Sequence, residues 1–277
     1  MQVNGVDLCV ETFGSPTDPA ILLVMGAGAS MDWWQDDFCA RLAAGPRYVI
    51  RYDHRDTGGS TSYPPGEPGY TGDDLVADAA AIIAVLGLRR AHVVGQSAGG
   101  ALAQVLALDH PERVASLTLV ATSPAGPDPD LPAMSDEASA AFAAIAEPDW
   151  PDRAAVIEYL TQQWRAGASR ARPFDEEGTR ALSARVVDRT ANMESSMKNA
   201  YAAERTDRWR ERLGELAVPT LVVHGTEDPL FPLGHGEALA REIPGAELLT
   251  LEGGGHELDR RDWDVVVPAI LRLTRES

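Results

Sequence analysis

This 277-residue chain is predicted to form an α/β fold built on a mostly parallel sheet, with one helical insertion. Short apolar runs of strand length alternate with helical patterns over the first 124 residues, as expected for parallel strands joined by helices. The strand pattern stops after Pro124, and only helical patterns occur over residues 133–212. Strand patterns return at 219–225 and 246–251, so the insertion interrupts a single sheet.

The first predicted elements are a hairpin and two strands. Asn4-Gly5 is a strong two-residue turn signal, and the alternation of apolar and polar residues over 6–11 is typical of a half-buried strand. Residues 20–24 and 48–52 are apolar runs, which are typical of strands that are covered on both faces.

Helices and strands alternate along the rest of the core. The predicted helices span residues 73–87, 101–108 and 263–273, and the predicted strands span 91–94, 117–120, 219–225 and 246–251. The first helix begins at Asp73 and Asp74, which favour the positive end of the helix dipole, and it can end at Gly87. This order predicts right-handed crossovers between parallel strands.

The chain therefore divides into a predicted core and a predicted helical cap. Residues 1–124 and 213–277 form the core, and residues 125–212 form the cap. We expect a substrate pocket lined by apolar side chains of the cap and of the loop after residue 24, namely Trp33, Phe142, Ile145 and Trp164. For Trp33, packing in the core is an equally good interpretation.

Composition narrows the classes of partner. The 24 basic and 42 acidic residues give a formal net charge of -18, which repels phosphate backbones and anionic lipid surfaces. We therefore expect no nucleic-acid or membrane partner. There is no run of about 18 apolar residues and no signal-peptide pattern at the start, so a cytoplasmic location is expected. The sequence leaves a homodimer open, and Cys9 and Cys39 are expected to be buried free thiols.

A candidate nucleophile lies between a predicted strand and a predicted helix. The segment Gly95-Gln96-Ser97-Ala98-Gly99 fits the pattern G-x-S-x-G, in which a sharp turn exposes the central serine. The two glycines would let strand and helix approach closely. The alternative interpretation is an ordinary strand–helix turn in which Ser97 is a helix cap.

A serine nucleophile needs a base and a carboxylate that orients the base. His256 follows three glycines directly after the last strand, where the loop can carry an imidazole over neighbouring strand ends. His224, at the end of a strand, is more simply a packed side chain, and His235 is expected in a surface turn or at a helix start. Asp228, in the loop after strand 219–225, is the predicted acid, and Glu227 is its rival.

Acyl transfer also needs donors for the developing oxyanion. We assign them to the backbone N–H groups of Ala98, which follows the nucleophile, and of Ala27, in the loop after strand 20–24. Gly26 is the alternative to Ala27. A phosphate-binding loop is a second interpretation of Gly26 and Gly28, but Met31 stands where the dinucleotide fingerprint needs its third glycine.

Taken together, these motifs resemble those of the α/β-hydrolase superfamily. The resemblance rests on the G-x-S-x-G segment, on Asp53-x-Arg55-x-x-Gly58-x-Ser60, on residues 110–114 and on the pairing of Asp228 with Gly255-His256. It implies an α/β-hydrolase fold, a mostly parallel central sheet with helices on both faces and an inserted helical cap.

Within that superfamily, residues 23–26 and 52–58 are similar to the branch of aclacinomycin methylesterases, which remove a methyl ester from an anthracycline polyketide. This chain has Gln96 and Ala98 where that branch usually has Leu and Met, and Met25 where most of the superfamily has His.

The expected activity is hydrolysis of a small or medium apolar carboxylic ester, including methyl esters, by a Ser-His-Asp triad with an acyl-enzyme. The substrates are then a small-molecule ester and water, with no cofactor and no metal, since no metal-binding spacing occurs. The same triad would serve a cofactor-independent perhydrolase or haloperoxidase, a lactone hydrolase or a C–C bond hydrolase. A non-catalytic binding protein that retains the pocket is the alternative from another class.

Overall fold

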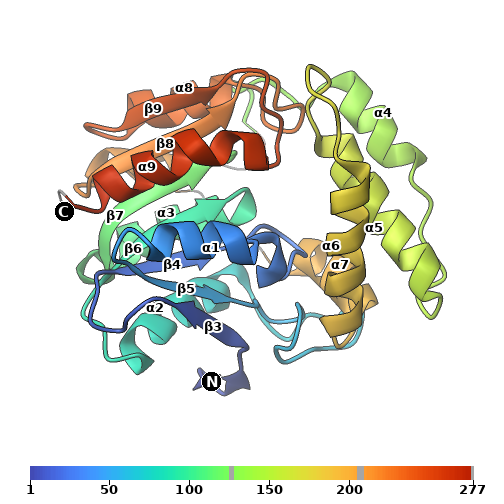
Figure 1. The fold of residues 1–277 in the computed structure, drawn as a ribbon, viewed down its shortest axis with the longest axis horizontal. Coiled ribbons are helices and arrows are strands. Elements are labelled where there is room, and N and C mark those ends of the chain that lie inside the picture. Colours follow the sequence, from blue (N-terminus) through green and yellow to red (C-terminus); the bar gives the residue numbers. More distant parts are fainter. Residues whose placement is uncertain (125–127, 205–208, 276–277) are drawn as a thin grey trace.

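The computed structural model describes residues 1–124, 128–204 and 209–275. Its main sheet contains seven strands in the order β3-β5-β4-β6-β7-β8-β9 (Figure 1). All neighbouring pairs are parallel except β3 and β5, which are antiparallel. The strands are β3 (Val10–Phe13), β4 (Ala20–Val24), β5 (Tyr48–Tyr52), β6 (Ala91–Gln96), β7 (Val114–Val120), β8 (Thr220–Gly225) and β9 (Glu247–Leu251). The predicted mostly parallel α/β fold is therefore confirmed.

The predicted N-terminal hairpin is present, but it is shorter than expected. Strands β1 (Gln2–Val3) and β2 (Val6–Asp7) pair through a turn at Asn4 and Gly5, both with positive φ. The single strand predicted over residues 6–11 is wrong in extent, because the chain leaves the hairpin after Asp7. It then joins the main sheet as β3, where Val10 pairs with Tyr52.

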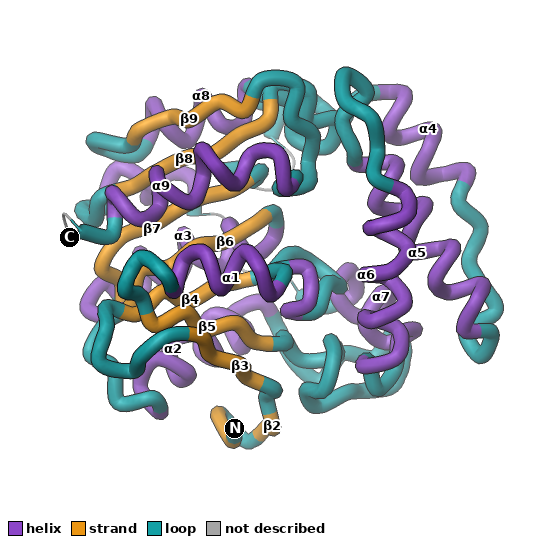
Figure 2. The backbone as a smooth tube through the Cα atoms, viewed as in Figure 1, coloured by secondary structure: helices purple, strands orange, loops and turns teal. Residues whose placement is uncertain are grey.

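Helices cover both faces of the sheet (Figure 2). One apolar cluster joins α2 (Gly72–Val85), α3 (Ala98–Asp109) and α8 (Gly234–Glu242) to one face, and a second joins α1 (Asp36–Ala43) and α9 (Trp263–Leu273) to the other. Alternate residues of β4 serve the two clusters, with Leu22 in the first and Leu23 in the second. The short helices α1 and α8 have no counterpart among the predicted elements.

Four helices fill most of the segment between β7 and β8. They are α4 (Asp136–Ala144), α5 (Arg153–Gly167), α6 (Glu176–Arg189) and α7 (Met193–Ala202), and no strand occurs in the described part of this segment. Figure 1 shows them together beside one end of the sheet. Val156, Leu160, Val186 and Met193 form a small apolar cluster of their own.

The two predicted boundaries of the cap, at residues 125 and 212, do not coincide with the ends of described elements. The start at residue 125 lies outside the described residues. The end at residue 212 falls inside the short helix η3 (Arg210–Glu215), whose Leu213 is part of the core cluster shared with α2 and α3. The division into core and cap stays a prediction. The remaining short helices are η1 (Met31–Trp33), η2 (Pro111–Arg113) and η4 (Arg260–Asp262).

Two further sequence expectations concern single features. In the ranges 1–124, 128–204 and 209–275, no helix combines the length and the apolar character needed to cross a bilayer. Both cysteines are free, and Cys39 is buried as predicted. The prediction is wrong for Cys9, which is only half-buried because it leads into β3, the edge strand of the sheet.

Candidate active site

Ser97 stands alone between the end of β6 and the start of α3, with φ 54° and ψ -124°. A positive φ is strained for a residue with a side chain, so the surrounding structure must hold it. The Ser97 amide donates to the Val120 carbonyl at 3.0 Å, and Thr122 Oγ1 donates to the Ser97 carbonyl at 2.7 Å. A Cβ on Gly95 or Gly99 would collide with neighbouring backbone, so both glycines permit the close strand–helix contact that the sequence predicts.

Asp228 is a buried carboxylate in the loop after β8. Its Oδ1 accepts hydrogen bonds from the amides of Leu230 at 2.9 Å and Phe231 at 3.0 Å. Burial acts to raise the pKa of Asp228, but the charge and hydrogen bond of His256 outweigh it, helped by His224 and the Phe231 amide, and hold that pKa below 3.8. The carboxylate is therefore ionised, and its orientation is fixed.

His256 completes a short chain of contacts. Its Nδ1 lies 2.9 Å from Asp228 Oδ2, and because an ionised carboxylate can only accept, Nδ1 carries the proton and Nε2 presents its lone pair. Burial acts to lower the pKa of His256, but attraction to Asp228, their hydrogen bond and the charge of Glu257 raise it above 6.5. Gln96 Nε2 donates to the His256 carbonyl at 3.2 Å, which ties this loop to the residue before Ser97.

The sheet brings these loops together at the carboxyl ends of its parallel strands. Strands β6, β8 and β9 are parallel, with β7 between β6 and β8, so the loops that follow them leave from the same side. Among the described residues, no hydrogen bond is made by the Ser97 hydroxyl. Contacts of this kind are often long in free enzymes and tighten when substrate binds.

The rival residues occupy other positions. His224 is fully buried, with Nε2 at 2.7 Å from the Phe231 carbonyl. His235 is the second residue of α8 and bonds Ser123 Oγ at 2.9 Å and the Pro132 carbonyl at 2.8 Å. The expectation of a helix start is correct for His235, but it is buried because these two partners enclose it. Glu227 is exposed, unlike its neighbour Asp228.

The loop after β4 lies against the serine. A Cβ placed on Gly26 would be 3.2 Å from the Cβ of Ser97, so a side chain there would require Ser97 or the loop to move by a few tenths of an ångström. Ala27, the next residue, is half-buried, and Ala98 is the first residue of α3. Both amides assigned to the oxyanion are thus in segments adjacent to Ser97.

The expected pocket residues have different described contacts, and their role as a pocket stays a prediction. The rings of Trp33 and Trp164 stack at a centroid distance of 3.9 Å, and both also pack against the core cluster around α1 and α9. A Cβ on Gly167 would lie 3.7 Å from the Cβ of His256 and 3.9 Å from the Phe142 ring, which places Phe142 near His256. Ile145 caps the C-terminal end of α4, and no described contact connects it with Ser97 or His256.

Sequence reasoning missed two side chains that act on His256, Phe231 by ring contact and Glu257 by its charge. The Phe231 ring meets the imidazole edge to face at a centroid distance of 5.5 Å. Burial raises the pKa of Glu257 to about 7, and its Oε2 is buried without a hydrogen-bond partner. Closeness in sequence to Asp228 or to His256 is the one available signal for both, and it does not show which way a side chain turns.

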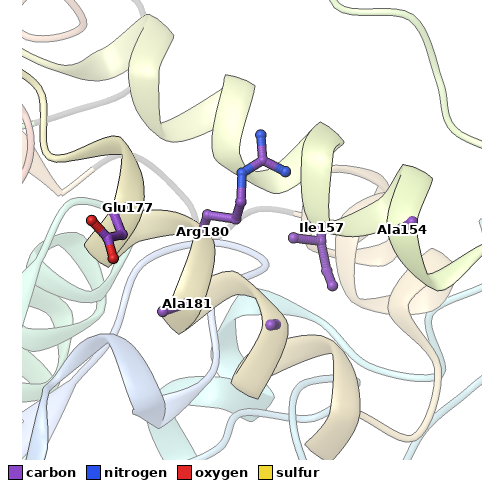
Figure 3. Close-up of a pocket in the computed structure, with 6 residues that line it drawn as sticks. Ala154, Ile157, Glu177, Arg180 and Ala181 are labelled. Atoms are coloured by element: carbon purple, nitrogen blue, oxygen red, sulfur yellow. The ribbon is translucent and has the colours of Figure 1, made fainter.

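A separate surface hollow of about 410 Å³ lies between α5 and α6, far along the chain from the serine (Figure 3). Ala154 and Ile157 come from α5, and Glu177, Arg180 and Ala181 come from α6. None of the residues around Ser97 lines it. In the described ranges, no group of three or more His, Cys, Asp or Glu side chains is arranged to hold a metal ion.

The fold and these motifs can be compared with known proteins. A family model described as the alpha/beta hydrolase fold matches residues 19–258, most of the chain. The chain belongs to the α/β-hydrolase fold family. The crystal structure of an enol-lactonase from Burkholderia xenovorans LB400 superposes on this α/β hydrolase with a TM-score of 0.75 at 24% identity, covering 99% of this chain and 98% of the other. That likeness supports the fold.

Two curated relatives carry information about activity. Rhodomycin D methylesterase DauP of Streptomyces sp. (strain C5) is 31% identical over 287 residues, and DnrP of Streptomyces peucetius, with the same description, is 30% identical. Each alignment covers 98% of this chain and 96% of the relative. The resemblance to a methylesterase branch is confirmed. This α/β hydrolase is therefore an enzyme that hydrolyses ester bonds.

Proposed function

We propose that this enzyme cleaves a small or medium carboxylic ester with Ser97 as nucleophile, His256 as general base and Asp228 as the carboxylate that orients the base. The observation that carries the proposal is the 2.9 Å hydrogen bond between His256 Nδ1 and the buried Asp228 carboxylate, in a loop tied through Gln96 to the strained serine turn. Such a carboxylate fixes the tautomer and the ring orientation of the imidazole.

Acylation follows from these positions. Ser97 Oγ attacks the ester carbonyl carbon while His256 Nε2 takes the hydroxyl proton, and the carbonyl oxygen becomes an oxyanion facing the amides of Ala27 and Ala98. The C–O bond to the alcohol then breaks, and the imidazolium returns its proton to the departing oxygen. The products of this half-reaction are the free alcohol and an acyl group on Ser97.

Deacylation repeats the steps with water. His256 Nε2 removes a proton from water as its oxygen attacks the acyl carbon, and the second tetrahedral intermediate expels Ser97 Oγ, which regains the proton. The carboxylic acid product is released. The reaction consumes one ester and one water, and it needs no cofactor.

A methyl ester of a large apolar acid is the proposed substrate. Two full-length relatives are methylesterases, and the stacked Trp33 and Trp164 rings join the helices of the 125–212 segment to the core beside the site. We propose that this segment acts as a lid and sets the preference for the acyl group, as helical insertions over active sites do.

The decisive experiment compares Ser97→Ala with Ser139→Ala, a matched change at an exposed serine of α4. Ser97→Ala should lose methyl ester hydrolysis and labelling by a fluorophosphonate while keeping its melting temperature, and Ser139→Ala should keep all three. Near-normal turnover by Ser97→Ala would show that the nucleophile is assigned wrongly.

A substrate panel then separates the activities that share this triad. Methyl, ethyl and aryl esters of graded acyl size, lactones, and acetate with hydrogen peroxide would be tested on the same preparation. A methyl ester with a large acyl group should give the highest kcat/KM. A higher value for lactones, or activity that depends on peroxide, would reassign the substrate and leave the triad in place.

A further inference from the structure

The loop that carries one proposed oxyanion donor is held from three sides. Residues 25–31 lead from β4 into the first residue of η1, and this loop includes Ala27. At the start of the loop, the Met25 carbonyl accepts a hydrogen bond from His54 Nε2 at 3.0 Å. At the end, the Met31 amide donates to Asp53 Oδ1 at 2.8 Å. Both partners lie directly after β5, so hydrogen bonds from the core hold the two ends of the loop.

The third hold comes from the helices between β7 and β8. Ser196 Oγ, on α7, donates to the Gly28 carbonyl at 3.0 Å, one residue beyond Ala27, and Ser196 is 2% exposed. Gly28 has φ +67°, and a Cβ there would lie 3.0 Å from the Ser196 carbonyl oxygen. The backbones of the loop and of α7 therefore approach as closely as a glycine allows.

Arg189, at the end of α6, reaches the same loop through Asp53. Its Nη2 lies 2.8 Å from Asp53 Oδ1, the oxygen that also accepts from the Met31 amide. Its Nε lies 2.8 Å from Asp32 Oδ2, just past the loop. Asp53 and Asp32 are at most 1% exposed, so the Arg189 guanidinium compensates two buried carboxylates, and Arg185 Nε adds a second contact to Asp32 at 3.0 Å.

We propose that Ser196 and Arg189 are positioning residues that hold the 25–31 loop in the shape in which the Ala27 amide stabilises the oxyanion. The helices that would cover the substrate thereby also complete the transition-state site, an inference that rests on the proposed function. Oxyanion donors act only where charge develops, so a loosened loop lowers kcat more than it changes KM. Small misplacements of such groups are costly, since about 1 Å can cost on the order of 100-fold in rate.

The test combines kinetics with a transition-state analogue. A methyl trifluoromethyl ketone adds to Ser97 Oγ, whose proton passes to His256, and the adduct carries the oxyanion. For Ser196→Ala we expect kcat to fall about 10-fold with KM within about 2-fold, and the affinity for the ketone to fall by the same factor as kcat/KM. Ser196→Thr keeps a hydroxyl and should recover part of the loss.

Neighbouring positions provide matched controls. Lys198→Ala, two residues along α7, removes half-buried ion pairs with Glu194 and Glu147, and Asp188→Ala removes the exposed pair with Arg153 beside Arg189. Both should keep kcat and ketone affinity. Arg189→Lys keeps one charge but loses the paired N–H groups, so it should lose kcat as Ser196→Ala does. Should Arg189→Lys fail to fold, Ser196→Ala decides.

The outcomes separate the two proposals. Unchanged kcat and ketone affinity in Ser196→Ala, with activity abolished in Ser97→Ala, would overturn the role of the loop contacts and keep the triad. Loss of kcat with no loss of ketone affinity would also overturn it, because the defect would then lie outside oxyanion stabilisation. Activity retained in Ser97→Ala would overturn both.

Discussion

Two clusters of buried charge stand where strands of the sheet end, and they differ in the cation that each carboxylate faces. Asp228, after β8, faces the imidazole of His256, while Asp53, after β5, faces the guanidinium of Arg189. Both carboxylates are at most 3% exposed. An imidazole gains and loses its proton near neutral pH, whereas a guanidinium stays charged. The first cluster can therefore transfer a proton, and the second can only hold structure.

The variant with the largest expected effect disrupts the cluster of Asp228 and His256. Asp228→Asn keeps the shape of the side chain but removes its charge and presents a donor to His256, so the imidazole loses its preferred tautomer. We expect kcat to fall about 10⁴-fold with little change in melting temperature. Glu227→Gln is the control at the neighbouring exposed carboxylate and should be silent. Equal losses in the two variants would show that the acid is not specific to position 228.

The variant with the next largest effect disrupts the cluster of Asp53 and Arg189. Arg189→Leu leaves Asp53 buried without its cation and leaves Asp32 with Arg185 alone, and the free energy of unfolding should fall by about 3–5 kcal/mol. Urea unfolding of Arg189→Leu and Asp188→Ala measures this, because Asp188 lies in an exposed pair where solvent screens the charges. An Arg189→Leu variant as stable as the wild type would mean that water or another group compensates these carboxylates.

The difference between the clusters should also appear in the pH profile. The pKa of His256 is raised above 6.5 by Asp228, against the opposing effect of burial. Because the neutral imidazole is the active base, kcat/KM should fall as the pH drops through that pKa, with its midpoint above 6.5. Asp228 stays ionised throughout, and Arg189 does not titrate. A profile that is flat down to pH 5 would contradict the assignment of the base.

The smallest expected effect concerns how stability depends on pH, and it comes from Glu257, whose carboxyl is buried beside His256. Burial raises its pKa from 4.5 to about 7, so the folded protein binds more protons than the unfolded chain between these values. Stability contributed by this group is therefore lost as the pH rises through that window. Glu257→Gln should be more stable than wild type at pH 8 by about 1–3 kcal/mol, and this difference should vanish near pH 4.

Unfolding curves at the two pH values test this, with the exposed Glu252→Gln as control. A constant difference between wild type and Glu257→Gln across the pH range would exclude titration as the cause. Removal of the Glu257 charge should also move the acid limb of kcat/KM to lower pH, since that charge helps to raise the pKa of His256.

Much of the sheet could be predicted because its signals are local. Each apolar run at 20–24, 48–52 and 219–225 is long enough for a buried strand, and each became one. The turn at Asn4-Gly5 and the glycines around Ser97 are read from residue type alone, since few residues accept those backbone angles or contacts. Helices α1 and α8 were missed because they have only 8 and 9 residues, so each shows little more than two turns of periodic pattern.

The order of residues by itself determined the strand–helix alternation, the tight turn that carries Ser97, and the placement of Asp228 and His256 in loops after strands, because these depend on neighbours along the chain. Only the tertiary structure decided that Ser196 contacts the 25–31 loop, that Arg189 reaches this loop through Asp53, that Glu257 Oε2 is buried, and that Trp33 stacks on Trp164. Such contacts join residues more than a hundred positions apart or depend on which way one side chain turns. Local periodicity in the sequence predicts neither long-range contacts nor side-chain direction.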